Sequence, residues 1–281
     1  MLFNFPIIDF HAHLFPDTFF EAIWKAFQRD YRWEVAYRYY APQILEFLRG
    51  QAVGTIVYSN YAHKPGAAAF LNQWNRELIS KEENLYCFAA VHPADSDLLP
   101  NATELLRHPR ILGFKLQLLV QRFYPDDERL FPLYEAVIEA GKRILMHVGT
   151  GPVGNEFVGM AGLRRLLRRY PQLRVNIPHM GALEFQPTLE LLDEYPQLYL
   201  DTAFSFLPFP GMGYPLGPET LLRYQDRILY GSDFPNILFP WDSEIKFLKS
   251  LNLGEGFYRK VFRENGLKLL LMTTSSSIRE V

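Results

Sequence analysis

The sequence has almost no cysteine and no long apolar run. Cys87 is the single cysteine, so the chain cannot form an internal disulfide, which is compatible with a reducing, cytoplasmic setting. No uninterrupted apolar stretch reaches the length of a membrane span. Residues 1–6 lack the basic start and apolar run of a signal peptide. We therefore expect a cytoplasmic protein that does not associate with membranes.

The sequence also has no marked excess of positive or negative residues. Lys and Arg total 29 and Asp and Glu total 31, which gives a formal net charge of −2. This balance provides no electrostatic attraction to nucleic acid or to an anionic membrane surface. A small-molecule substrate fits these absences best. A homo-oligomer stays open, with the aromatic segment 17–50 and the Pro-rich loop 206–218 as candidate contact surfaces.

The chain has enough apolar residues for one large domain. Hydrophobic residues make up 48% of its 281 residues and charged residues 21%, and no linker or fixed-period repeat divides it. We expect a single domain over residues 1–281, with 273–281 as a loosely held tail.

Apolar, β-branched segments alternate with helical patterns along the whole chain. Eight such strands predict a closed parallel (β/α)8 TIM barrel, and an open doubly wound sheet rarely needs so many units. The predicted strands span residues 6–13, 52–59, 85–93, 111–116, 143–149, 173–179, 198–202 and 228–233.

A mostly helical excursion rich in aromatic residues follows the first strand, over residues 17–50. Trp24, Trp33 and Tyr37 are among its aromatic residues. They are explained either by ordinary core packing or by a cap that lines a cleft with aromatic faces and excludes water.

The first strand ends in two histidines one residue apart. Because side chains alternate along a strand, we expect Ile7, Asp9, His11 and His13 on one face. Two imidazoles on one face at a strand end form half of a site for a divalent metal, although the pair alone is weak evidence.

Polar side chains also lie at the ends of most of the remaining predicted strands. The carboxyl ends of the strands of such a barrel meet at one face and build its site. Of seven histidines only His108 lies elsewhere, in a turn before a strand. Small residues such as Gly149, Gly181 and Gly231 beside these side chains would leave room for metal, water or substrate. The residues concerned are His11, His13, His63, His92, Lys115, His147, His179 and Asp233.

Five short motifs occur in order along the chain. They are Asp-Phe-His-Ala-His from Asp9, Gly-Phe-Lys-Leu from Gly113, Met-His-Val-Gly from Met146, Pro-His-Met-Gly from Pro178 and Tyr-Gly-Ser-Asp-Phe-Pro from Tyr230. In this order the chain resembles the amidohydrolase superfamily of TIM barrels. It is similar in particular to the branch that includes the aminocarboxymuconate-semialdehyde and dihydroxybenzoate decarboxylases. The resemblance runs from Asp9 to the segment 262–265.

This resemblance implies one divalent metal held by His11, His13, His147 and Asp233. Zn²⁺ is the first choice and Mn²⁺ the second, with one position left for a water whose pKa falls to about 7. His179 would shuttle a proton or polarise a substrate oxygen, and Asp233 could also take the proton of the water. Asp9 is expected to support the site from below rather than to bind metal.

Lys115 has two interpretations. Some family members carboxylate a lysine on the fourth strand and use it to bridge two metals, in which case His147 and His179 would serve the second metal. Otherwise its ammonium would bind a substrate carboxylate. We favour one metal, because the branch that the chain resembles most is mononuclear.

The expected activity is hydrolysis of an amide, ester or lactone bond in a small organic acid, with cyclic and aromatic acids preferred. The alternative is a non-oxidative, metal-dependent decarboxylase of an aromatic or muconate-like acid, which would use the same residues. A barrel that binds a metal or partner without catalysis is the third interpretation. His63, His92 and Trp33 are candidate substrate contacts.

Overall fold

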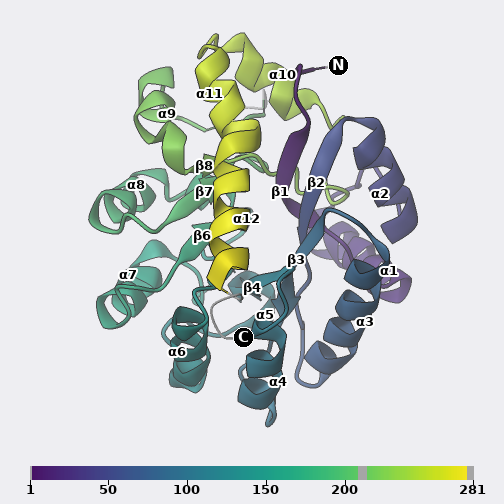
Figure 1. Ribbon diagram of the computed structural model, residues 1–281, viewed down its shortest axis with the longest axis vertical. Coiled ribbons are helices and arrows are strands. Elements are labelled where there is room, and N and C mark those ends of the chain that lie inside the picture. Colours follow the sequence, from purple (N-terminus) through teal and green to yellow (C-terminus); the bar gives the residue numbers. More distant parts are fainter. Residues whose placement is uncertain (1, 208–213, 277–281) are drawn as a thin grey trace.

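The protein forms a single eight-stranded parallel sheet, which confirms the predicted barrel. The computed structural model describes residues 2–207 and 214–276. Each strand pairs with the next in sequence order, and the chain returns to each through a helical connection (Figure 1). The strands are β1 (Ile7–His13), β2 (Val53–Ser59), β3 (Leu85–Ala90), β4 (Ile111–Gln117), β5 (Arg143–His147), β6 (Val175–Ile177), β7 (Tyr199–Asp201) and β8 (Ile228–Leu229).

The chain following β8 lies against β1. Backbone hydrogen bonds run from Phe10 to the carbonyl of Tyr230, from Asp233 to that of His11 and from His13 to that of Phe234. These bonds bring the last strand end beside the first, so that both ends contribute to the same side of the barrel.

Helices surround the sheet and bury one apolar face each against it (Figure 1). In α7, for example, Leu163, Leu166 and Leu167 are buried, while arginines occupy the other face. The helices are α1 (Asp17–Ala26), α2 (Ala41–Gly50), α3 (Ala67–Lys81), α4 (Leu98–Leu106), α5 (Leu118–Gln121), α6 (Phe131–Glu139), α7 (Met160–Arg169), α8 (Phe185–Glu194), α9 (Pro218–Tyr224), α10 (Ser243–Ser250), α11 (Glu255–Arg259) and α12 (Asn265–Ser276). None of the helices in the described part of the chain combines the length and the apolar character needed to span a membrane.

The last helix, α12, covers one end of the barrel (Figure 1). Its Leu269 and Leu270 join an inner apolar cluster with residues of seven strands, among them Ile8 and Phe10. Residues 273–276, expected within a loose tail, continue this helix, and Thr273 Oγ1 donates to the carbonyl of Leu269. The rest of that predicted tail, 277–281, lies outside the described residues, as does part of the loop 206–218.

Strict alternation along β1 does not hold. Ile7 packs in the outer cluster with the helices, whereas Ile8 and Phe10 belong to the inner cluster. The pairing of β1 with β2 shifts between Asp9 and Ala12, and this bulge lets the consecutive residues Phe10 and His11 both reach the interior. The expectation that Ile7 shares a face with His11 was therefore wrong.

The aromatic excursion divides into two helices joined by an extended segment. A short π-helix, Phe27–Tyr31, extends α1, and the chain then runs without regular structure to α2. Tyr37 packs against Phe234 and Trp24 against Phe20, both as ordinary core contacts. Core packing thus explains much of this segment.

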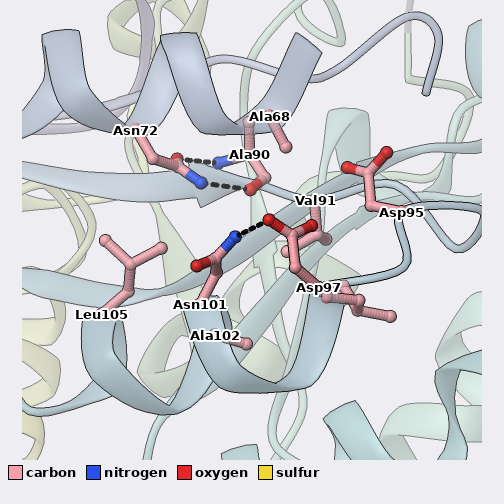
Figure 2. A pocket seen from close by; sticks show the side chains of 10 residues that line it. Ala68, Asn72, Ala90, Val91, Asp95, Asp97, Asn101, Ala102 and Leu105 are labelled. Carbon is pink, nitrogen blue, oxygen red and sulfur yellow. Dashed lines mark hydrogen bonds between the residues drawn. The ribbon is translucent and has the colours of Figure 1, made fainter. Parts of the chain in front are cut away.

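Two hollows in the described part of the chain have no histidine in their lining. A cavity of about 10 Å³ between α3 and α4 has polar side chains that bond to their neighbours: Asn72 to Ala90, and Asn101 to Asp97 (Figure 2). A cleft of about 390 Å³ is lined by residues of α1 and by Arg38 and Tyr40. Neither contains a candidate metal ligand, catalytic residue or substrate contact, although Trp24 of the aromatic excursion lines the cleft.

Candidate metal centre and active site

Three of the predicted ligands meet at one point. Nε2 of His13 lies 3.0 Å from Oδ1 of Asp233, and Nε2 of His11 lies 3.4 Å from the same oxygen. Two ligand atoms on one tetrahedral ion at about 2.1 Å would lie roughly 3.4 Å apart. His11, His13 and Asp233 therefore have the spacing of a metal-binding group.

Hydrogen bonds at Nδ1 of His11 and His13, on the side away from Asp233, indicate which nitrogen of each ring carries the proton. Nδ1 of His13 lies 3.2 Å from the carbonyl oxygen of Ser59, which can only accept, so Nδ1 carries the proton. Nδ1 of His11 donates likewise to Oδ2 of Asp201 over 2.9 Å. With a single proton on each ring, both Nε2 atoms present a lone pair toward the Asp233 oxygen, an arrangement that only a proton or a cation between them can relieve. A cation among these three atoms would satisfy all of them.

The electrostatics of the group favour the forms that bind metal. Burial, and then the charge of Lys115, hold the pKa of His11 well below its usual range, so this ring is neutral. In the metal-free protein burial alone would raise the pKa of Asp233, but the charge of His13 and its hydrogen bond to Oδ1 hold that pKa well below its usual range. Asp233 is therefore ionised at neutral pH.

His147 offers a fourth lone pair beside this group. Its Nε2 donates to the carbonyl oxygen of Gly151 over 3.0 Å, which leaves Nδ1 without a proton. That Nδ1 is buried and has no hydrogen-bond partner. The ring packs edge-to-face on His179 at 4.9 Å, and burial keeps its pKa well below the usual range. An orphaned acceptor of this kind fits a cation ligand, although His147 is not within the three-residue group itself.

Lys115 lies across the barrel from β1. Its side chain is fully buried, and Nζ is 3.5 Å from Nε2 of His11. Burial lowers the pKa of this ammonium to about 8, against the opposing charges of Asp233 and Asp201. Since an ammonium here would repel a neighbouring cation, a bound metal would favour the neutral amine.

His179 stands between His11 and His147. Its ring centroid is 5.2 Å from that of His11, and its Nδ1 donates to the carbonyl oxygen of Ala203 over 2.9 Å. Burial lowers its pKa, so the ring is neutral with Nε2 unprotonated. Both His179 and Asp233 have left-handed backbones, with φ of 58° and 56°, a conformation that a non-glycine residue adopts only when its surroundings hold it.

Sequence reasoning missed Asp201, at the end of β7. Besides its bond to His11, its Oδ1 accepts from the backbone N–H of His179 over 3.0 Å. It thus orients the ring of one candidate ligand and the backbone of the candidate proton shuttle. The rule that strand ends build the site could have selected Asp201, which is the last residue of β7 and the residue before the end of the predicted strand 198–202.

Asp9 holds the backbone that carries Asp233. Its carboxylate accepts from the backbone N–H groups of His11 and Ser232, both at 3.1 Å, and from the Ser232 hydroxyl. Burial raises the pKa of Asp9 to about 6. It supports the site without facing the group of three, as expected for it.

The glycines beside the imidazoles serve packing rather than a ligand. A Cβ on Gly149 would lie 2.6 Å from the carbonyl oxygen of Gly181, and one on Gly181 would lie 2.1 Å from Oγ1 of Thr188. At Gly231 a Cβ would lie 2.7 Å from Cβ of His11. The expected free space is therefore occupied by the chain itself.

The candidate substrate contacts lie outside the central group. His63 is exposed and packs edge-on against Phe19, while His92 accepts from the backbone N–H of Ala94. Trp33 stacks on Phe204 at 5.8 Å, and the Phe204 ring meets His179 edge-to-face at 6.5 Å. Trp33 is thus one ring removed from His179.

Imidazoles and a carboxylate gather at the strand ends of this TIM barrel. Enzymes with this fold build their active sites on the face formed by the carboxyl ends of the strands. The family model described as Amidohydrolase matches residues 8–271, so this chain belongs to the amidohydrolase family. No curated protein sequence matches the chain.

Several solved structures share the fold at low sequence identity. An uncharacterised TIM-barrel protein from Bordetella bronchiseptica has 18% identity and a TM-score of 0.72, covering 95% of this chain and 99% of its own. A probable 2-pyrone-4,6-dicarboxylic acid hydrolase from Acinetobacter baumannii has 16% identity, a TM-score of 0.62 and coverages of 94% and 98%. The 5-carboxyvanillate decarboxylase of Novosphingobium aromaticivorans, complexed with manganese, has 15% identity, a TM-score of 0.64 and coverages of 95% and 96%. These neighbours include hydrolases and decarboxylases.

Proposed function

We propose that this protein is a metal-dependent hydrolase that cleaves an amide, ester or lactone bond of a small organic acid. The observation that carries the proposal is the convergence of His11, His13 and Asp233, with both Nε2 atoms within 3.4 Å of one carboxylate oxygen. His147 is the proposed fourth ligand, and Zn²⁺ is preferred over Mn²⁺ for three imidazoles and a carboxylate. We favour a single metal, and a metal-to-protein ratio near two would instead support bridging by Lys115.

When bound, the cation supplies activation of water and polarisation of the substrate carbonyl. Asp233, ionised at neutral pH, would take the proton of the attacking water. His179 can accept or return a proton at Nε2, because its Nδ1 proton is held by Ala203. Lys115 and the ring of His179 both lie beside His11, and the reacting group would bind next to them.

A substrate can be oriented by polar groups of the described residues that have no hydrogen-bond partner within the protein. The side-chain oxygen of Gln117, at the end of β4, is buried without a hydrogen-bond partner, and Gln117 pairs in register with His147. We assign to Gln117 a hydrogen bond from the substrate. Trp33 and Phe204 form an aromatic wall beside His179, for which ring-shaped acids are the first substrates to test.

The second candidate function is a non-oxidative decarboxylase. Lys115 favours it, because a protonated amine buried beside His11 would bind a substrate carboxylate strongly. The similarity to the decarboxylase from Novosphingobium aromaticivorans is consistent with this candidate.

The test is turnover of a panel of lactones, aryl esters and hydroxybenzoates by the zinc-loaded and manganese-loaded protein. Hydrolysis without release of carbon dioxide supports the first function, and carbon dioxide release supports the second. His179→Ala should retain its metal and lose about 10²–10⁴-fold in turnover, because a positioned acid–base group contributes that much. Loss of metal in His179→Ala would contradict its assigned role, and a metal-loaded protein that turns over nothing in the panel would contradict both activities.

A further inference from the structure

Glu244, in the first turn of α10, is a buried carboxylate outside the group of candidate ligands. Glu244 is only 2% exposed. Both of its carboxyl oxygens accept hydrogen bonds from backbone N–H groups. Oε2 accepts from the N–H of Phe204 over 3.1 Å, and Oε1 from that of Phe206 over 3.0 Å. Burial raises the pKa of this group to about 8, and these amides oppose that rise.

The amides that Glu244 holds belong to the loop after β7. Phe204 has a left-handed backbone with φ of 58°, which turns neighbouring N–H groups of the loop toward one point. On its other side the loop is held by Asp201, which accepts from the N–H of Ala203 over 3.2 Å. The short segment 203–206 is therefore fixed at both ends by a carboxylate.

This segment contacts His179 in two ways. The carbonyl oxygen of Ala203 accepts from Nδ1 of His179, and the ring of Phe204 packs edge-to-face on the imidazole. Since a carbonyl can only accept, the position of Ala203 decides which nitrogen of His179 carries the proton. Displacement of the segment would break the hydrogen bond at Nδ1. The proton could then move to Nε2, and the ring could rotate.

We propose that Glu244 is a positioning residue that acts through the segment 203–206 to fix the orientation and the tautomer of His179. The inference rests on the proposed function for its catalytic meaning. Glu244 touches neither the candidate ligands nor a reacting atom. A glutamate with a merely structural role would hold the loop without any influence on the protonation of His179.

The experiment uses Glu244→Gln in the zinc-loaded protein. Glutamine keeps the shape of the side chain but faces one amide N–H with its own NH2 group, so one of the two hydrogen bonds is lost. The readout is long-range ¹⁵N–¹H correlation spectra of the imidazoles, with the His179 signals assigned by their loss in His179→Gln. Glu135→Gln is the control, because Glu135 lies on α6 and accepts from the hydroxyl of Tyr170 at the end of α7, away from this loop.

The wild type and Glu135→Gln should show a neutral His179 protonated at Nδ1. Glu244→Gln should shift this ring to a mixture of tautomers, with its zinc content unchanged and with kcat on any panel substrate lowered more than KM. Glu244→Asp, which keeps the carboxyl group one methylene further back, should shift the same signals. His179 signals identical to wild type in both variants would overturn the inference. A changed tautomer in a protein that hydrolyses nothing would support the inference and contradict the proposed function separately.

Discussion

His11 is the residue on which the candidate centre depends most. Its Nδ1 is bound to Asp201, and its Nε2 lies near Asp233 and Lys115, side chains from β7, from the loop after β8 and from β4. A single ring thus joins parts of the chain that are far apart in sequence. Because it is buried and neutral, it can bind a cation without first losing a proton.

Removal of a central ligand should release the metal. We expect His11→Ala and Asp233→Ala each to lose bound zinc, because two ligands of the group of three cannot replace the third. Elemental analysis of the purified variants measures this, with His108→Ala as the control outside the site. Full zinc content in both variants would refute the ligand assignment.

Replacement of Asp201 should lower the affinity of the protein for zinc, but not the number of zinc ions bound at saturation. Asp201→Asn leaves His11 in place but weakens the bond that fixes its tautomer, so we expect zinc affinity to fall about 10–100-fold. Competition with a chromogenic chelator measures the change. Asp193→Asn, which alters an exposed partner of Arg223, should leave the affinity at its wild-type value.

At the scale of elements, the loops after β7 and β8 are shaped by buried carboxylates on neighbouring elements. Asp9 on β1 holds Ser232 beside Asp233, and Glu244 on α10 holds the segment 203–206. Each carboxylate satisfies backbone N–H groups that would otherwise be buried without a partner. These two loops are therefore fixed by contacts with neighbouring elements rather than by their own local sequence.

Glu244 should give the stability of the protein a distinct pH dependence. Its pKa rises from 4.5 in the unfolded chain to about 8 in the fold, so the folded state binds the proton more tightly across that interval. Stability from this group is present at low pH and lost as pH rises through the interval. Since buried histidines titrate in the same region, the wild type must be compared with Glu244→Gln.

Urea unfolding of the metal-free proteins measures the effect. The free energy of unfolding of the wild type should fall relative to that of Glu244→Gln between about pH 5 and about pH 9, by about 1.4 kcal/mol per pKa unit at most. A constant difference between the two proteins over this range would show that Glu244 does not titrate as expected.

For the whole molecule, α12 completes the core of the barrel. Leu269, 2% exposed, packs among residues from seven strands, so its contacts exist only when the barrel has closed. We expect Leu269→Ala to cost about 2–5 kcal/mol, as for a buried leucine. Leu267→Ala, at a position that is 41% exposed on the same helix, should change stability by less than about 0.5 kcal/mol.

Denaturant unfolding followed by circular dichroism distinguishes the two leucine variants. Equal losses of stability would mean that α12 is held by something other than its inner face. Zinc should raise the melting temperature of both, because a ligand that binds only the folded state stabilises it.

Local patterns in the sequence were sufficient for the architecture and for many of the side chains at the site. The alternation of apolar strands and helices specifies a parallel barrel, and the rule that strand ends converge then brings His11, His13 and Asp233 together. These inferences work because periodicity and strand ends are local features. His63 and His92, selected by the same rule, lie outside the central group because the position of a loop side chain depends on its packing.

Tertiary structure alone decided which groups support the candidate ligands. The bulge in β1, the bond from His11 to Asp201 and the hold of Glu244 on Phe204 depend on contacts between residues remote in the chain. A buried carboxylate needs donors on every side, and no local pattern records where those donors come from. The sequence by itself therefore determined the barrel and which polar residues gather at its strand ends, whereas folding determined the hydrogen bonds around these residues and the order of the surrounding loops.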